Sequence, residues 1–339
     1  MTVAAIAESC GFSSAQYFYK VFTKKCKEIL EDNLDIDTSV TVPTDLPEQC
    51  FPLLKETEII FSSWGMPTPD SQRVSGLFPN LKEIYYAAGS VQTFARPFFD
   101  NNIRIFSAPA ANGVPVAEYT VAQIILANKG FFWSSRYQSK GNMEKAIEKR
   151  ADTKGNFDCK VGLIGVGMIG SLVAKMLKNY RVEVLAFDPF LSDERAKELG
   201  VKKASLEEIF STCETVSNHL ADNDDTAGML GRELFDKMSD TATFINTGRG
   251  RQVDETALAD FMEKHPFATA LLDVTFPEPP KENSPFYTLD NVILSPHIAG
   301  SIGNEVCRMG EYMTEEFLRV QKGERPFYEV VPDMLKTMA

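Results

Sequence analysis

The sequence has few cysteines and histidines, and they do not cluster. Its six cysteines are scattered over 339 residues (Cys10, Cys26, Cys50, Cys159, Cys213 and Cys307), with no CxxC pair and no grouping with the three histidines. A disulfide framework or a zinc site would need closer spacing. We therefore expect reduced thiols and no metal site.

Basic charge and long apolar runs are also scarce. Lys and Arg number 35 against 47 Asp and Glu, which gives a formal net charge of -12. Such a field repels nucleic acid and anionic membrane surfaces. The apolar stretches fall short of a membrane span, and no basic segment followed by an apolar run and a cleavage site opens the sequence. We expect a soluble, cytoplasmic protein whose partner is a small molecule rather than nucleic acid or membrane.

Strand-like and helix-like segments alternate through the centre of the chain. Residues 160–164 (KVGLI) form a short apolar run, residues 169–178 carry apolar side chains at helical spacing, and residues 182–187 (VEVLAF) form a second apolar run. Further strand-like runs lie at 214–217, 243–246, 268–272 and 291–294, and a helix is expected at 254–264. This alternation predicts a doubly wound α/β sheet covered on both faces.

The flanking regions alternate in the same way. Strand-like runs lie at 58–61, 81–85 and 103–106, Pro115 opens a long apolar helix over about residues 117–136, and another helix is expected at 304–321. We predict one α/β domain at residues 1–115, completed by residues 300–339. A second domain, residues 116–299, is inserted into it.

A glycine-rich turn follows the strand at 160–164. Gly165-Val166-Gly167-Met168-Ile169-Gly170 fits GxGxxG and stands between a strand and a helix, the context that dinucleotide binding requires. The first glycine allows the tight turn, the second lets backbone approach a pyrophosphate, and the third lets helix and strand pack closely. The exposed N–H groups of the helix start, including those of Met168 and Ile169, attract phosphate.

Asp188 ends the next strand, 18 residues after Gly170. A carboxylate there can accept hydrogen bonds from both ribose hydroxyls of NAD and repels the 2′-phosphate of NADP. The alternative is a solvated aspartate beside an ordinary Gly-rich turn. The order strand, turn, helix, strand and acid favours NAD as the cofactor.

Three polar residues follow later strands. Arg249 lies just after 243–246, Glu278 after 268–272, and His297 after 291–294. The carboxyl ends of parallel strands converge on the ligand crevice, so the three side chains are expected to meet there. Oxidation of a 2-hydroxy acid needs a group that takes the hydroxyl proton, which suits a histidine. A carboxylate fixes the imidazole tautomer, and an arginine holds a substrate carboxylate and polarises a keto oxygen.

Singly, each of these residues also fits a turn, a solvated loop or an ordinary histidine. Together, the stretches VGLIGVGMIG, VLAFDP, FINTGRG, ALLDVTFPEP and NVILSPHIAG, with VAE at 116–118, closely resemble the D-isomer-specific 2-hydroxyacid dehydrogenases. The resemblance covers about residues 46–320. It implies two doubly wound parallel-sheet domains, a Rossmann NAD-binding domain inserted into a flavodoxin-like substrate domain.

The resemblance also implies roles for individual residues. His297 would be the general acid/base, Glu278 its partner, and Arg249 the anchor of the substrate carboxylate. Gly165, Gly167, Met168, Ile169, Gly170, Asp188, Asn246, Thr247, Gly248, Asp273 and Gly300 would bind NAD, with Asp273 at the nicotinamide carboxamide. The loop Ala88-Gly89-Ser90 would bind the substrate carboxylate. Members of the family usually dimerise through the cofactor domain, so we expect a homodimer.

The chain departs from the family in two loops. Residues 90–94 read SVQTF near a position where the family often has an aspartate, and His219-Leu220-Ala221 stands where many members have Leu-Pro. The substrate therefore stays open among glyoxylate, hydroxypyruvate, phosphoglycerate and branched or aromatic 2-keto acids. Four residues could shape the pocket or simply pack: Trp64, Met66, Gln92 and Trp133.

Residues 1–25 do not fit the family. They lack a recognisable opening strand, and residues 3–25 resemble one helix-turn-helix of AraC-type regulators, with a turn Gly11 and a helix bearing Phe18 and Phe22. The alternative is an amphipathic extension or fusion remnant packed on the substrate domain. This resemblance leaves a rival function open, that of an NAD(H)-sensing transcriptional regulator on the dehydrogenase fold. A third possibility is a dehydrogenase-like protein whose catalysis is impaired by its altered first strand.

Overall fold

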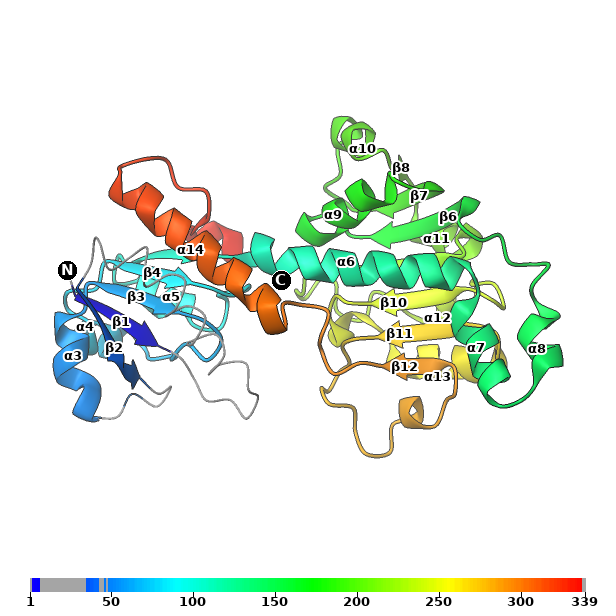
Figure 1. The fold of residues 1–339 in the computed structure, drawn as a ribbon, viewed down its shortest axis with the longest axis horizontal. Helices are drawn as coiled ribbons and strands as arrows, with labels where there is room; N and C mark the ends of the chain where they lie inside the picture. The colour runs from blue at the N-terminus through cyan, green and yellow to red at the C-terminus, as the bar shows by residue number, and fades with distance from the viewer. Residues whose placement is uncertain (1, 7–34, 43–45, 47, 337–339) are drawn as a thin grey trace. The chain divides into compact units, whose positions relative to one another are not determined.

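A computed structural model describes residues 2–6, 35–42, 46 and 48–336. The chain divides into two compact units, each described by itself (Figure 1). The first unit comprises residues 1–112 and 301–338, and the second comprises residues 113–300. The second unit is thus inserted in sequence between two parts of the first.

A seven-stranded parallel sheet forms the second unit. Its strands follow in the order β12-β11-β10-β9-β6-β7-β8. Their bounds are β6 Phe157–Ile164, β7 Arg181–Phe187, β8 Lys202–Lys203, β9 Thr215–Asn218, β10 Thr243–Asn246, β11 Thr269–Leu272 and β12 Val292–Leu294. From β6 the chain builds outward to β8 and then returns to place β9 on the other side of β6. This reversal is the switch point at which doubly wound sheets bind dinucleotides.

Helices cover both faces of this sheet. One face carries α6 (Pro109–Asn128), α9 (Met168–Leu177) and α10 (Asp193–Leu199), and the other carries α11 (Leu206–Thr212), α12 (Arg232–Phe235) and α13 (Glu255–Lys264). Every residue of the central strands β9, β10 and β11 is buried. Burial on both faces explains why the sequence shows these strands as unbroken runs without alternation.

The first unit is a smaller sheet of the same kind. Its strands are β1 Thr2–Ile6, β2 Asp35–Val42, β3 Ile59–Ser62, β4 Glu83–Tyr86, β5 Arg104–Ser107 and β13 Glu329–Val330, in the order β2-β1-β3-β4-β5-β13. All pairs are parallel except β5 with β13. The order 2-1-3-4-5 is the flavodoxin-like one. The predicted fold class, two doubly wound parallel-sheet domains, is confirmed.

Short helices and one long one enclose this second core. Helices α3 (Phe51–Glu56), α4 (Ser71–Leu77) and α5 (Ala95–Phe99) pack on one face, and α14 (Val306–Gln321) covers the other. On the α14 face, Tyr85 stacks on Phe106 with ring centroids 4.7 Å apart and meets Phe317 edge-on. The other elements are α7 (Phe131–Ser139), α8 (Met143–Glu148) and the 3-10 turns η2 (Glu48–Cys50), η3 (Gly250–Gln252), η4 (Pro285–Tyr287), η5 (Gly303–Glu305) and η6 (Pro332–Lys336).

Two expectations were wrong. The opening strand is present, because Thr2–Ile6 form β1 and pair in parallel with both β2 and β3. A short apolar run such as TVAAI fits a central parallel strand as well as a buried helix, which is why periodicity misread it. The strand removes the start of the proposed helix-turn-helix. The rest of that motif, residues 7–25, lies outside the described residues.

The second error concerns the long helix expected at 117–136. It begins earlier, at Pro109, and is two helices, α6 and α7, separated at Gly130. Gly130 has φ +65°, and a Cβ there would lie 2.6 Å from Nε1 of Trp133. A left-handed glycine ends the first helix where most other residues would continue it. Among the helices of the described chain, none is long and apolar enough to cross a membrane.

Candidate active site

The register of the seven-stranded sheet places the motifs side by side. Across six strands, one row of paired positions holds Phe187, Ile164, Asn218, Asn246, Leu272 and Leu294. The residues that follow them directly are Asp188, Gly165, His219, Thr247, Asp273 and Ser295. Segments far apart in the sequence therefore open onto one edge of the sheet, at its carboxyl end.

Two of the three glycines of the dinucleotide turn are required by close contacts within the chain, and the third lies in open space. Gly165 has φ +84°, and a Cβ there would lie 2.7 Å from the carbonyl oxygen of His219. A Cβ on Gly170 would lie 2.1 Å from the carbonyl oxygen of Gly165, so only glycine lets α9 pack against the turn. A Cβ on Gly167 would meet no atom within 4 Å. The surface over Gly167 is open at the start of α9, where a pyrophosphate needs room.

Asp188 braces the same turn. Its Oδ2 accepts a hydrogen bond from the backbone N–H of Val166 at 2.9 Å, and its Oδ1 accepts one from Phe190 at 2.9 Å. Each carboxylate oxygen retains a further lone pair for a ribose hydroxyl. The residues of this turn therefore fit the adenosine half of a dinucleotide, including a carboxylate where a ribose would bind.

His219 follows β9 and lies beside the turn. Its Nε2 lies 3.0 Å from Ser217 Oγ, and its Nδ1 lies 3.4 Å from Thr247 Oγ1. Burial lowers the pKa of His219 to about 4. The ring is therefore neutral near pH 7 and brings no positive charge to the sheet edge.

His297 and Glu278 form a pair at the same edge. His297 Nδ1 lies 2.8 Å from Glu278 Oε1, and both side chains are about half exposed. With Nδ1 engaged by the carboxylate, Nε2 of the ring is left to exchange a proton. His297 has φ +53°, a left-handed conformation that is unfavourable for a residue with a Cβ. The loop is thus held in a conformation that the histidine alone would not choose.

Asp273 supplies what holds that loop. Its carboxylate is buried; Oδ1 accepts from Ser295 Oγ at 2.6 Å and from the N–H of Ile298 at 2.9 Å, and Oδ2 accepts from the N–H of Ala299 at 2.9 Å. The backbone N–H of His297 donates to the carbonyl oxygen of Asp273 at 3.0 Å. Asp273 therefore binds the residues on both sides of His297.

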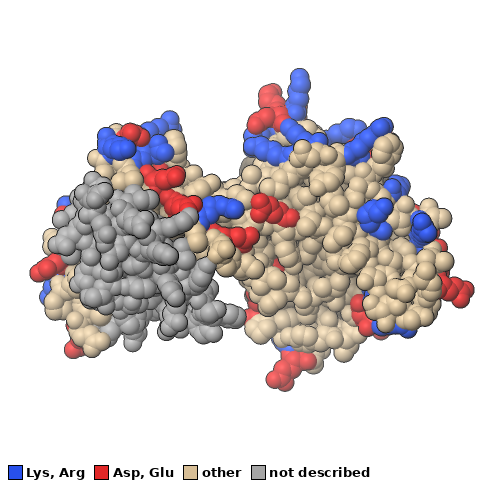
Figure 2. All heavy atoms as spheres, viewed as in Figure 1, with Lys and Arg blue, Asp and Glu red and all other residues tan. Residues whose placement is uncertain are grey.

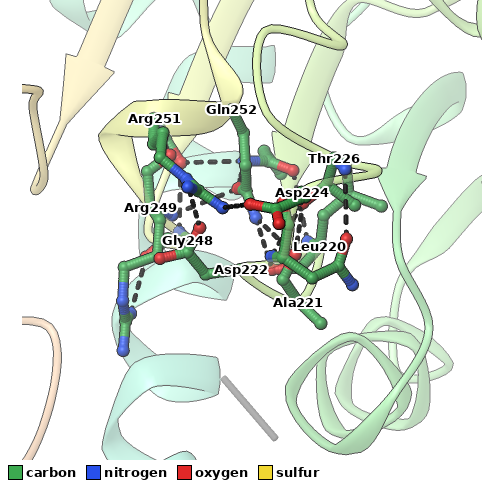
Figure 3. A network of polar contacts seen from close by, with 12 residues as sticks. Leu220, Ala221, Asp222, Asp224, Thr226, Gly248, Arg249, Arg251 and Gln252 are labelled. Atoms are coloured by element: carbon green, nitrogen blue, oxygen red, sulfur yellow. Dashed lines mark hydrogen bonds and ion pairs between the residues drawn. The ribbon is translucent and has the colours of Figure 1, made fainter. Parts of the chain in front are cut away.

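Arg249 lies in a turn between β10 and η3. Its guanidinium donates to the carbonyl oxygen of Gly248 at 2.8 Å, and in Figure 3 it extends away from Asp224 and Thr226. The next residue, Gly250, packs directly on the segment that leads to Glu278: a Cβ there would lie 2.0 Å from the carbonyl carbon of Thr275. The structure thus brings His297 and Glu278 into contact and sets the Arg249 turn against the Glu278 loop.

The predicted substrate loop belongs to the first unit, after β4. Ser107 Oγ donates to the carbonyl oxygens of Ala88 at 3.1 Å and Gly89 at 2.5 Å. In a trans peptide, N–H and C=O point in opposite directions, so the N–H groups of Gly89 and Ser90 point away from Ser107. This geometry suits the binding of an anion by backbone N–H groups.

The four pocket candidates separate by burial. Met66 is in the core of the first unit, and Trp133 is buried edge-on against Phe267, so both are packing residues. Trp64, which follows β3, is 38% exposed, and Gln92 is exposed as well, so these two stay candidates for shaping the pocket. Among the described residues, no group of three or more His, Cys, Asp or Glu side chains could hold a metal ion.

Comparison with known proteins agrees with this geometry. The sequence model of the D-isomer specific 2-hydroxyacid dehydrogenase NAD binding domain matches residues 121–299. The chain belongs to the D-isomer specific 2-hydroxyacid dehydrogenase family. The predicted family and its cofactor, NAD, are confirmed, and the second unit is the part that the NAD-binding model covers.

Relatives with different names share this family. D-3-phosphoglycerate dehydrogenase of Archaeoglobus fulgidus is 33% identical over 65% of this chain, and the chain spans only 41% of that protein. Glyoxylate reductase of Korarchaeum cryptofilum is 29% identical over 73% of this chain and 75% of its own length. The structure of D-lactate dehydrogenase with NAD+ from Lactobacillus jensenii superposes with a TM-score of 0.75 at 21% identity, covering 98% of this chain and 100% of that one. The last likeness concerns the fold alone.

Several residues of the site were missed by sequence reasoning. Ser295 bonds Asp273, and Tyr119 OH lies 2.9 Å from Ser295 Oγ. Glu255 Oε1 accepts from the N–H of Phe276 at 2.7 Å, two residues before Glu278, and burial raises the pKa of Glu255. Gln252 is wholly buried beneath Arg249. None of these residues carried a signal in the sequence; Gln252, for example, stands between Arg251 and Val253 in the mixed stretch GRGRQVDE.

Proposed function

We propose that this protein interconverts a small D-2-hydroxy acid and its 2-keto acid with NAD as the hydride carrier. The observation that supports this best is the His297–Glu278 pair, 2.8 Å apart at the strand edge that also carries the dinucleotide turn. A binding protein for NAD needs no acid/base there, whereas hydride transfer to a keto acid does. The family contains both reductases and dehydrogenases by name, which is consistent with one reaction run in either direction.

The proposed division of roles is the one that the family resemblance implies, and the His297–Glu278 contact supports it. When bound, the nicotinamide supplies or accepts the hydride. His297 gives a proton to the keto oxygen in reduction and takes it back in oxidation. Glu278 fixes the tautomer of His297 and stabilises its protonated form. Arg249 holds the substrate carboxylate, since a guanidinium offers paired N–H donors to two oxygens.

The proposal also includes the other predicted contacts with the cofactor and the substrate. Asn246, Thr247, Gly248 and Gly300 would line the nicotinamide side, Met168 and Ile169 would present backbone at the start of α9, and Ala88, Gly89 and Ser90 would bind the substrate carboxylate. Asp188 favours NAD over NADP because its charge opposes a 2′-phosphate.

A panel of 2-keto acids tests the function. With NADH, we expect at least one of glyoxylate, hydroxypyruvate, phosphohydroxypyruvate and branched or aromatic 2-keto acids to cause loss of absorbance at 340 nm. Replacing NADH by NADPH should lower kcat/KM about tenfold or more, because the 2′-phosphate meets the Asp188 carboxylate. No turnover of any acid, with NADH binding intact, would contradict the proposal.

We also propose a homodimer formed through the cofactor domain. Figure 2 shows the surface over α6 and α7 as largely uncharged, and Leu126 and Phe131 are 41% and 46% exposed there. Apolar surface of this kind is typical of subunit interfaces. Light scattering at micromolar concentration should give twice the mass of the 37.8 kDa chain; a monomer would refute the dimer without affecting the proposed reaction.

A further inference from the structure

A buried amide side chain lies directly beneath the turn that carries Arg249. Gln252 has no exposed surface, and Figure 3 shows it between this turn and the loop at Leu220 and Ala221. Its Oε1 accepts from Arg249 N–H at 3.2 Å and from Asn218 Nδ2 at 2.6 Å. Its Nε2 donates to the carbonyl oxygens of Leu220 and Ala221, each at 2.9 Å. Both donors and both lone pairs of the amide are therefore used.

The orientation of this amide is fixed by backbone groups. Arg249 N–H can only donate, and the carbonyl oxygens of Leu220 and Ala221 can only accept. A flipped amide would set its NH2 against Arg249 N–H and its oxygen against two carbonyl oxygens. Gln252 thus has one satisfactory orientation, and a side chain of similar shape without these groups would satisfy none of the three backbone partners.

A second amide holds the other side of the Arg249 peptide. Asn246 Nδ2 donates to the carbonyl oxygen of Arg249 at 3.2 Å, and Asn246 Oδ1 accepts from Gly248 N–H at 3.1 Å. Asn218 Nδ2 donates to Asn246 Oδ1 at 3.0 Å as well as to Gln252. Gly248 closes the arrangement, because a Cβ there would lie 2.9 Å from both Asn218 Nδ2 and Gln252 Oε1. The N–H and the carbonyl oxygen of Arg249 are therefore each bound by a buried amide side chain.

The solvent-facing part of the same network consists of ion pairs rather than buried amides. Arg251 pairs with Asp222 and Asp224 at 3.1 Å each, but its side chain is 36% exposed and that of Asp224 is 99% exposed. Exposed ion pairs contribute little and are screened by salt. Removing a buried amide, in contrast, leaves the buried groups that it bound without a hydrogen-bond partner.

We propose that Gln252 is a positioning residue that fixes the Arg249 peptide and so aims its guanidinium at the substrate carboxylate. This inference rests on the proposed function, in which Arg249 is the anchor. Gln252 has no exposed surface with which to touch a substrate or a cofactor. Its effect reaches the substrate only through Arg249, which separates it from a residue that merely stabilises the fold.

A double-mutant cycle tests this coupling. The probe is oxamate, a non-reacting isostere of a 2-keto acid, titrated into the protein–NADH complex by fluorescence. Gln252→Met keeps the side-chain length without the amide; we expect the Kd of oxamate to rise about tenfold and the Kd of NADH to stay within about twofold. Arg249→Lys loses the paired donors and should also raise the oxamate Kd about tenfold or more. The oxamate Kd of the double variant should lie within about threefold of that of Arg249→Lys. Once the arginine is gone, fixing the backbone at position 249 no longer affects how the substrate carboxylate is held.

Asp224→Asn is the matched control in the same network and should bind oxamate as the wild type does. Effects of Gln252→Met and Arg249→Lys that multiply, or equal weakening of NADH and oxamate by Gln252→Met, would overturn the inference. Wild-type oxamate binding by Arg249→Lys would instead refute the proposed anchor. If Gln252→Met does not fold, Gln252→Glu enters the same cycle. It keeps an acceptor for Arg249 N–H but sets an oxygen against two carbonyl oxygens, so a non-additive rise in oxamate Kd at least as large is expected, and an additive one would overturn the inference.

Discussion

Replacing His297 by asparagine should lower kcat about 10²- to 10⁴-fold, the range over which one positioned acid/base contributes. Asparagine is the chosen substitute because His297 has φ +53°, and asparagine tolerates the left-handed region better than alanine does. The loop should therefore keep its path while the proton-exchanging ring is lost. The measurement is initial-rate reduction of the best 2-keto acid of the panel, with the Kd of NADH measured by fluorescence and expected within about twofold of wild type.

The chain offers a matched control for this variant. His265 Nδ1 lies 2.7 Å from Asp240 Oδ1, an imidazole–carboxylate pair of nearly the same length. His265 ends α13 just before β11 begins, so it lies at the amino edge of the sheet rather than at the carboxyl edge. His265→Asn should leave kcat within about twofold of wild type, because no strand-end site converges there. Equal activity of His297→Asn and wild type would refute the acid/base assignment.

The sequence predicts those parts of the candidate site whose chemistry is local. The spacing of three glycines predicts the dinucleotide turn: Gly165, Gly167 and Gly170. Three polar residues each follow an apolar run that reads as a strand: Arg249, Glu278 and His297. Parallel register then brings those strand ends to one edge without further information. What remained hidden depends on contacts between distant segments: nothing in the sequence pairs Gln252 with Asn218, or Ser295 with Asp273, before the strands are in register.

The two errors in the fold have a related cause. Thr2–Ile6 is an apolar run too short to show a period, and its neighbours β2 and β3, which make it a strand, come 29 or more residues later in the chain. The break between α6 and α7 depends on a single positive φ at Gly130, packed against Trp133. A glycine within an apolar helical pattern is compatible with an uninterrupted helix, and only the packing of that tryptophan decides otherwise.

Replacing Asp273 by asparagine should have the second-largest effect, through the loop that carries His297. All partners of the Asp273 carboxylate are donors: Ser295 Oγ and the N–H groups of Ile298 and Ala299. An asparagine NH2 necessarily faces at least one of them, so a buried donor loses its acceptor. We expect the free energy of unfolding to fall by about 2–4 kcal/mol and kcat to fall about 10²-fold, since His297 is no longer held in its left-handed conformation. Denaturant unfolding and initial rates of the same preparation measure the two effects.

Ser295→Ala is the variant with which the loss of stability and of kcat in Asp273→Asn is compared. It removes one neutral donor and leaves Asp273 bound to both backbone N–H groups, so a loss of about 1 kcal/mol and a small change in kcat are expected. The two roles of Asp273 also separate here. A carboxylate that binds only the nicotinamide carboxamide would, when replaced, weaken NADH and leave the free energy of unfolding of the protein without NADH unchanged. A carboxylate that holds the His297 loop must lower that free energy even when no dinucleotide is bound, and unchanged unfolding of Asp273→Asn without NADH would contradict this role.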